Sequence, residues 1–175
     1  MVLNTGAEGS AGRDARVTAA LESYYVVANV TFETGFDEGN GRADMLDHIF
    51  LTVSDVERSI AFYTAALAPL GINKCHDYDG KDGPPGHPDL KGFGAKGRVF
   101  FWLKQGQADS RAAHVGFVAN SQSEVDAAYA AAMAAGAADN GAPSARLYYD
   151  PRYYAANVLD PDGYSLEFVY KSWQH

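Results

Sequence analysis

The sequence of 175 residues predicts an α+β fold that consists of two successive βαβββ modules. The first observation is an internal repeat: residues 47–49 align with residues 113–115, and Gly97 aligns with Gly163 at the same offset of 66 positions (114 − 48). The second is that each half begins with a strand-like segment that leads into a helix-capping motif. The third is that three strand-like segments follow each helix. A single offset therefore relates two similar modules.

The first module begins with a strand at residues 46–53, which are rich in β-branched and apolar side chains. Ser54 and Glu57 then form a capping box, in which each side chain binds a backbone amide at the start of the helix. The apolar positions that follow recur at helical spacing and are Val56, Ile60, Tyr63 and Leu67. Gly71 is expected to end this helix. Further strands are expected at residues 72–78, 92–95 and 98–104.

The second module repeats this order. Residues 114–119 form its first strand, and Ser121 and Glu124 form a second capping box. The apolar side of the second helix comprises Val125, Ala128, Ala132 and Met133, and Gly136 ends the helix. Strands follow at residues 138–142, 153–160 and 164–170. The sequence Asp-Pro-Asp-Gly at residues 160–163 predicts a hairpin turn, because proline sets the first turn dihedral and glycine accepts a positive φ.

Composition and charge exclude several classes of protein. The chain has 14 basic and 22 acidic residues and a net charge of −8, so no basic face is expected to bind nucleic acid. Its single cysteine, Cys75, cannot form an intramolecular disulfide, which favours a reducing compartment. No apolar run approaches the roughly 20 residues that a membrane-spanning helix needs. The sequence therefore predicts a cytoplasmic protein with no membrane partner.

The domain organisation follows from the limits of the repeat. Residues 1–44 form an N-terminal extension of unknown role, and residues 45–173 form the repeat domain, with module one at 45–106 and module two at 112–171. The extension contains seven acidic and three basic residues among its 44 positions. It is interpreted as a functional arm, a dimer contact or a stretch upstream of the true start, since Met45 would be a natural start of the repeat domain.

Three side chains at related positions predict a metal site. His48 and His114 open equivalent strands, and a pseudo-twofold arrangement of the modules would bring them into one cleft. Glu167 lies in a strand that is apolar on both faces, where a carboxylate is costly unless it is paired or binds a metal. Two histidines and one carboxylate form the ligand set of catalytic sites that hold one divalent ion, such as Fe(II), Mn(II), Ni(II), Co(II) or Zn(II). At the offset of 66, Phe101 aligns with Glu167.

A second group of side chains precedes the last hairpin and predicts a substrate-binding wall. This group contains Arg146, Tyr148, Tyr149, Tyr153 and Tyr154. An arginine in such a wall would bind a carboxylate or phosphate, and a tyrosine hydroxyl would donate to an enolate or oxyanion. The alternative is an aromatic cluster that packs a loop. We select Arg146, Tyr148, Tyr154 and Phe101 as the candidate substrate-binding residues, and Glu167 as the candidate catalytic residue.

Three segments resemble the signature stretches of the vicinal oxygen chelate superfamily, which includes glyoxalase I, bleomycin-resistance proteins, fosfomycin-resistance transferases and extradiol dioxygenases. These segments are Asp-His-Ile-Phe-Leu-Thr-Val-Ser-Asp at 47–55, His-Val-Gly-Phe at 114–117 and Asp-Pro-Asp-Gly-Tyr-Ser-Leu-Glu at 160–167. The resemblance covers about residues 45–173. It implies a glyoxalase/dioxygenase-like fold in which the paired modules form a cupped mixed sheet around a metal held by His48, His114 and Glu167.

The resemblance also implies a homodimer, because single-domain members of the superfamily often complete each site with modules from two chains. The sequence departs from three of the named activities. Phe101 stands where glyoxalase I has a fourth metal ligand, and Phe50 stands where fosfomycin-resistance enzymes typically have a threonine. Extradiol dioxygenases generally have a further catalytic histidine, and His76 and His87 lie in loop-like stretches that do not correspond to it.

Three hypotheses of function follow. The first is a metal-dependent enzyme that chelates vicinal oxygens of a small-molecule substrate and performs lyase, isomerase or dioxygenase chemistry. The second is a metal-free protein of the bleomycin-resistance type, which binds a drug or metabolite without reaction. The third is a regulatory or assembly component that acts through residues 1–44. The residues favour the first hypothesis, because equivalent positions of both modules supply its ligands.

Overall fold

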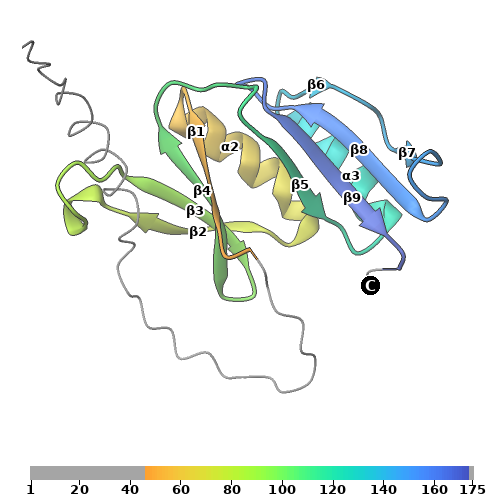
Figure 1. Ribbon diagram of the computed structural model, residues 1–175, viewed down its shortest axis with the longest axis horizontal. Helices are drawn as coiled ribbons and strands as arrows, with labels where there is room; N and C mark the ends of the chain where they lie inside the picture. The colour runs from red at the N-terminus through yellow and green to blue at the C-terminus, as the bar shows by residue number, and fades with distance from the viewer. Residues whose placement is uncertain (1–45, 174–175) are drawn as a thin grey trace, which may run out of the picture. The chain divides into compact units, whose positions relative to one another are not determined.

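The computed structural model describes residues 46–173 (Figure 1). The predicted N-terminal extension at residues 1–44 lies outside this described range. None of the helices within residues 46–173 is long and apolar enough to cross a membrane.

Module one forms a four-stranded mixed sheet covered by one helix. Its elements are β1 (Ile49–Val53), α2 (Val56–Leu67), the 3-10 helix η2 (Ala68–Leu70), β2 (Asn73–Tyr78), the 3-10 helix η3 (Gly80–Asp82), β3 (Leu90–Ala95) and β4 (Arg98–Gln105). The strand order is β1-β4-β3-β2. β1 pairs with β4 in parallel, and the other pairs are antiparallel.

Module two has the same plan. Its elements are β5 (His114–Val118), α3 (Gln122–Ala134), β6 (Ala138–Asp139), β7 (Ser144–Ala145), β8 (Tyr153–Leu159) and β9 (Ser165–Lys171). The strand order is β5-β9-β8-β6, and β7 also pairs with β8. The strand expected at residues 138–142 is shorter than predicted and consists of β6 alone, and the additional strand β7 follows outside that range. The predicted α+β fold of two βαβββ modules is confirmed, with one mixed sheet in each module.

The two helices begin where capping side chains accept backbone amides. The N-cap of α2 is Asp55, which accepts from the amide of Arg58 at 3.0 Å, so the prediction that Ser54 caps this helix is corrected by one residue. The N-cap of α3 is Ser121, as predicted, and its hydroxyl accepts from the amide of Glu124 at 3.2 Å. Because an unpaired amide at a helix start is costly, each cap determines where its helix begins.

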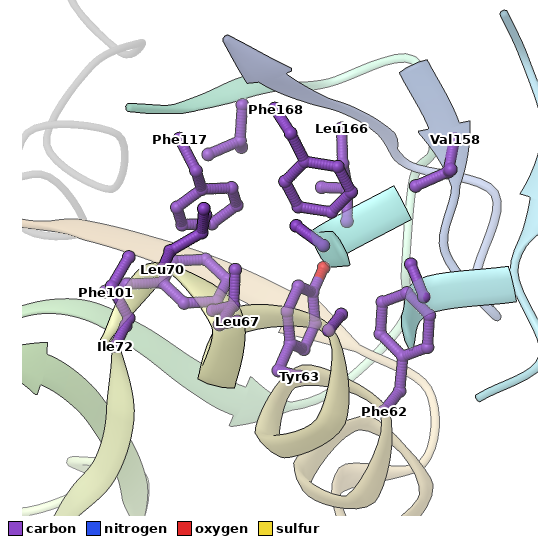
Figure 2. Close-up of a cluster of buried hydrophobic side chains, with 14 of the residues drawn as sticks. Phe62, Tyr63, Leu67, Leu70, Ile72, Phe101, Phe117, Val158, Leu166 and Phe168 are labelled. Atoms are coloured by element: carbon purple, nitrogen blue, oxygen red, sulfur yellow. The ribbon is translucent and has the colours of Figure 1, made fainter. Parts of the chain in front are cut away.

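One hydrophobic core joins the modules. Side chains from α2, such as Tyr63, lie against residues of both sheets, and Figure 2 shows this cluster. The ring of Phe101 on β4 lies 4.9 Å from that of Tyr63 and 5.4 Å from that of Phe117 on β5. All three residues are buried. Each large side chain contributes about 1.5–3 kcal/mol by its removal from water, so the shared cluster stabilises the modules as one unit.

The turn between β8 and β9 binds module one through polar contacts. The buried carboxylate of Asp160 accepts from the hydroxyl of Tyr63 on α2 at 2.7 Å. Asp162 accepts from the amide of Ser54 at 2.9 Å and from the guanidinium of Arg58 at 2.6 Å. The predicted hairpin turn therefore also anchors the start of α2.

We predict that Tyr63→Phe destabilises the protein, and that the effect grows with pH. Burial raises the pKa of the Asp160 carboxyl, although hydrogen bonds from Tyr63 and from backbone amides oppose this shift. Because its pKa is higher in the folded protein than in the unfolded chain, the protonated carboxyl favours the folded state. This stabilisation is lost as the pH rises through the pKa of the folded protein. The Tyr63 hydroxyl supports the ionised form, so its removal should cost about 1–3 kcal/mol at neutral pH.

Urea unfolding of the wild type and of Tyr63→Phe at pH 7 and at about pH 4 measures this effect. The difference between the two proteins should shrink at the lower pH. Tyr148→Phe is the matched control, because the Tyr148 side chain is exposed and should leave the free energy of unfolding unchanged. An equal cost at both pH values would contradict the assignment of the hydrogen bond to the ionised carboxylate.

Candidate functional site

The outer faces of β5 and β9 bring two of the predicted metal ligands together. Side chains alternate along a strand, so Leu166 and Phe168 on β9 enter the core while Glu167 lies on the opposite face. In the parallel ladder, Glu167 is paired with Gly116 and Ser165 with His114. Since Gly116 has no side chain, β5 leaves room next to the carboxylate of Glu167, whose Oε2 lies 3.9 Å from the place that a Cβ of residue 116 would take.

His114 and Glu167 form the centre of the candidate site. Nε2 of His114 lies 3.6 Å from Oε2 of Glu167, and Nδ1 of His114 lies 2.9 Å from the hydroxyl of Ser165. The His114 side chain is 53% exposed and that of Glu167 is 15% exposed. Ser165 therefore occupies one ring nitrogen of His114, and the other faces the carboxylate.

Tyr153 binds the second oxygen of the same carboxylate. Its hydroxyl donates to Oε1 of Glu167 at 3.1 Å. Burial, with the negative charge of Glu167, raises the pKa of Tyr153 to about 12. The hydroxyl therefore stays protonated at neutral pH and continues to donate. The two oxygens of Glu167 thus have different neighbours, Tyr153 on one and His114 on the other.

A cavity of about 450 Å³ opens beside this pair. Its lining residues are His114, Arg146, Tyr148, Tyr149, Asp150, Tyr153, Asn157, Glu167 and Trp173. Two of the residues predicted to bind substrate, Arg146 and Tyr148, are among them. The sequence prediction did not select Tyr153, Asn157 or Trp173. The alternation of β8 could have found Tyr153 and Asn157, which share a strand face, whereas Trp173 follows the last strand and carries no pattern.

Tyr154, which was predicted to bind substrate, does not line the cavity. It follows Tyr153 in β8, so its side chain lies on the opposite face of the sheet. Its hydroxyl donates to Asp126 of α3 at 2.9 Å. The prediction that Tyr154 lies at the site is therefore corrected, and its neighbour Tyr153 lines the cavity instead.

Arg146 is held in place by uncharged acceptors. Its Nη1 donates to the hydroxyl of Ser144 at 2.8 Å, and its Nη2 donates to the carbonyls of Gly141 and Ala142 at 3.2 and 3.3 Å. Nη2 also lies 3.4 Å from Oδ1 of Asn157. These bonds orient the guanidinium at the cavity without neutralising its charge.

Phe101, also predicted to bind substrate, lies in the core and has no exposed surface. In the sheet of module one, Ile49 pairs with Phe101 and Phe50 pairs with Trp102. The corresponding pair in module two is Gly116 with Glu167, so the structural equivalent of Glu167 is Trp102. The prediction that Phe101 binds substrate is therefore corrected, and Trp102 occupies the position in module one that corresponds to Glu167.

The reason for this one-residue shift is an irregularity in the pairing of β3 and β4. Phe93 pairs with Phe101 and Gly94 with Val99, which leaves Phe100 as an extra residue between Gly97 and Trp102. Trp102 therefore lies five positions after Gly97, whereas Glu167 lies four positions after Gly163. A shift by one residue moves every side chain to the other face of a strand.

His48 does not join His114 and Glu167 within the chain. Its Nδ1 lies 2.5 Å from Oδ1 of Asp47, and its ring contacts Phe50 edge-on at 5.0 Å. No three metal-ligating side chains gather within residues 46–173.

Comparison with known proteins identifies the family. The family model of the Glyoxalase/Bleomycin resistance protein/Dioxygenase superfamily matches residues 45–168. No curated protein matches the chain. Among solved structures, a glyoxalase/bleomycin resistance protein from Albidiferax ferrireducens T118 is 25% identical, with a TM-score of 0.57 over 71% of this chain and 97% of that one.

Two further solved structures show the same fold. A glyoxylase/bleomycin resistance protein/dioxygenase domain from Frankia sp. EAN1pec is 19% identical, with a TM-score of 0.56 over 74% of this chain and 99% of that one. A glyoxalase/bleomycin resistance protein/dioxygenase family enzyme from Burkholderia phytofirmans PsJN is 18% identical, with a TM-score of 0.52 over 70% of this chain and 95% of that one. The resemblance of the three sequence segments is thereby confirmed. The chain belongs to the glyoxalase/bleomycin resistance protein/dioxygenase superfamily.

Proposed function

We propose that the protein is a metal-dependent enzyme that chelates vicinal oxygens of a small substrate with one divalent ion. The observation that supports this proposal most directly is the pair of His114 and Glu167, whose Nε2 and Oε2 atoms lie 3.6 Å apart at a cavity. Two ligand atoms of different chemistry that converge in this way suit Fe(II), Mn(II), Ni(II), Co(II) or Zn(II).

The surroundings of His114 fit a metal ligand. Histidines that bind metals usually engage their other ring nitrogen in a hydrogen bond, which fixes the tautomer and the orientation of the ring. Ser165 provides this contact to Nδ1 of His114 at 2.9 Å. A bound divalent ion would act as a Lewis acid that polarises a substrate oxygen and stabilises negative charge on it.

The proposed third ligand is His48 of a second copy of the chain, in a homodimer. His48 and Phe50 lie on the outer face of β1, just as His114 and Val118 lie on the outer face of β5. Phe50 is 41% exposed and Val118 is 58% exposed, and exposed apolar side chains of this size often mark an interface. A second copy that covers these faces would bring one His48 to each pair of His114 and Glu167.

The protein's own side chains would orient and stabilise the substrate. Glu167 would hold or accept a proton beside the reacting carbon in addition to its role as a ligand. The hydroxyl of Tyr153, which donates to Glu167 in the free site, would turn to donate to a substrate oxygen that gains negative charge. Lyase, isomerase and dioxygenase reactions all fit this arrangement.

We predict that the purified protein binds about one divalent ion per chain and that His114→Ala loses it. Elemental analysis of the dialysed protein measures both quantities. His87→Ala is the matched control, because His87 lies in the loop before β3, contacts the carbonyl of Pro88 and does not line the cavity of the site. A wild type that binds no metal after reconstitution, or a His114→Ala variant that retains it, would contradict the proposal.

A second candidate function is metal-free binding of a small molecule, as in the bleomycin-resistance type. One observation favours it: the hydroxyl of Tyr153 donates to Glu167, which offsets part of the cost of burying the carboxylate without any metal. In that case a ligand would bind the cavity with the same affinity before and after treatment with a chelator. Isothermal titration under both conditions distinguishes the two candidates.

A further inference from the structure

Arg146 gives the cavity a positive charge that the described residues do not neutralise. Among residues 46–173, no ion pair of Arg146 occurs, and its hydrogen bonds reach only a hydroxyl, two carbonyls and an amide oxygen. The one other carboxylate at the cavity besides Glu167 is Asp150, which already pairs with Arg152 at 3.0 Å. A partly buried guanidinium in this situation favours an anion from outside the chain.

Four aromatic rings form a continuous row along the same cavity, which we call the aromatic row: Tyr148, Tyr149, Tyr153 and Trp173. The centroids of successive rings lie 4.5, 5.2 and 6.4 Å apart. Tyr148 is 74% exposed, Tyr149 68% and Trp173 42%. Exposed rings that gather at a cavity are typical of ligand-binding surfaces, since a flat apolar ligand would remove them from water.

The guanidinium of Arg146 lies close to the proposed metal ligands. Nη2 of Arg146 lies 3.4 Å from Oδ1 of Asn157, and Asn157 is the cross-strand partner of Glu167. Side chains of directly opposed residues lie on one face, about 5 Å apart at their Cβ atoms. A ligand whose anionic group binds Arg146 would therefore extend its adjacent atoms toward Glu167 and His114.

We propose that the ligand of this cavity is a small aromatic carboxylate, with its carboxylate on Arg146 and its ring against the aromatic row. This inference rests on the proposed function for the role of the cavity but not for the binding of the anion. The guanidinium fork matches the two oxygens of a carboxylate, and a volume of about 450 Å³ lies in the range of small-molecule sites. A polar oxygen next to the carboxylate would reach the pair of His114 and Glu167.

Benzoate is the probe that tests this inference, with benzamide as its uncharged analogue and acetate as the anion without a ring. Isothermal titration of the chelator-treated wild type should give the tightest binding for benzoate, with benzamide and acetate each weaker by about tenfold or more. Arg146→Gln should bind benzoate no better than benzamide. Arg111→Gln is the matched control, because Arg111 is exposed and its side chain bonds, among residues 46–173, only to Asp109. The affinity of this variant for benzoate should equal that of the wild type.

Each outcome decides the inference. Equal affinities of the wild type for benzoate and benzamide, or no binding of benzoate, would overturn it. The comparison of the three probes on the wild type remains decisive if Arg146→Gln does not fold, and Arg146→Lys then retains the charge without the fork. Because the titration uses chelator-treated protein, a loss of metal binding contradicts only the proposed function, whereas a loss of benzoate binding contradicts only the anion site.

Discussion

A mixed dimer of two inactive variants is expected to recover metal binding. His48→Ala and His114→Ala should each lose the metal as homodimers, because every site then lacks a histidine. In a mixed dimer, one site lacks both histidines, whereas the other combines His48 of one chain with His114 of its partner. The mixed dimer should therefore hold about one ion, half of the wild-type content.

Differently tagged chains, co-expressed and purified through both tags, give this mixed dimer, and elemental analysis measures its metal. Mixed dimers of His48→Ala with His87→Ala are the control. Only one of their two sites lacks His48, so these dimers should also hold about one ion. Retention of full metal content by the His48→Ala homodimer would exclude His48 as a ligand. A mixed dimer without metal, formed from folded chains, would show that sites are not shared between chains.

The second large effect is expected at Phe101. Its ring has no exposed surface and contacts Tyr63 and Phe117, so Phe101→Ala should lower the free energy of unfolding by about 3–5 kcal/mol. The affinity of the folded variant for metal and for benzoate should not change, because the side chain does not reach the cavity. Urea unfolding followed by circular dichroism, with titration of the folded protein, measures both quantities.

Trp102→Ala is the matched comparison, because Trp102 is adjacent to Phe101 on β4 and lies on the outer face, edge-on to His76 at 5.8 Å. Its removal should cost roughly 1 kcal/mol, as expected for a side chain that is only partly buried. If Phe101→Ala does not fold, Phe101→Leu, which keeps part of the packing, replaces it in the unfolding measurement. A larger loss for Trp102→Ala than for Phe101→Ala would contradict the register of β1 and β4.

The sequence was sufficient to predict the repeat and most of the elements. Apolar periodicity depends on local geometry, and the helices and longer strands begin and end within a few residues of the expected positions. Ser121 caps its helix as predicted, because its hydroxyl accepts from the amide of Glu124, only three residues further along the chain. Asp55 replaced Ser54 at the other helix because Ser54 binds Asp162 of the distant turn, a contact that no local pattern contains.

The candidate site was predicted in part for a similar reason. His114 and Glu167 converge because neighbouring strands place them on one face, and their spacing from strand starts is visible in the sequence. Phe101 was selected one residue away from the exposed face of β4, because the extra residue Phe100 changes the offset between the modules. Tyr154 was selected from a run of tyrosines, in which the alternation of β8 decides which ring faces the cavity. The position of His48 depends on the packing of whole modules, which periodicity does not describe.

The unequal turns of the two modules also have different roles. Residues 96 and 97 reverse the chain between β3 and β4, whereas residues 160–164 include side chains that bind the other half. The second module therefore carries a contact between the halves in its turn. Glu167 follows this turn on β9. The segment that holds the two halves together therefore leads directly into the strand that carries the proposed chemistry. A mutation that restored symmetry between the two copies would therefore remove a contact that each half now needs.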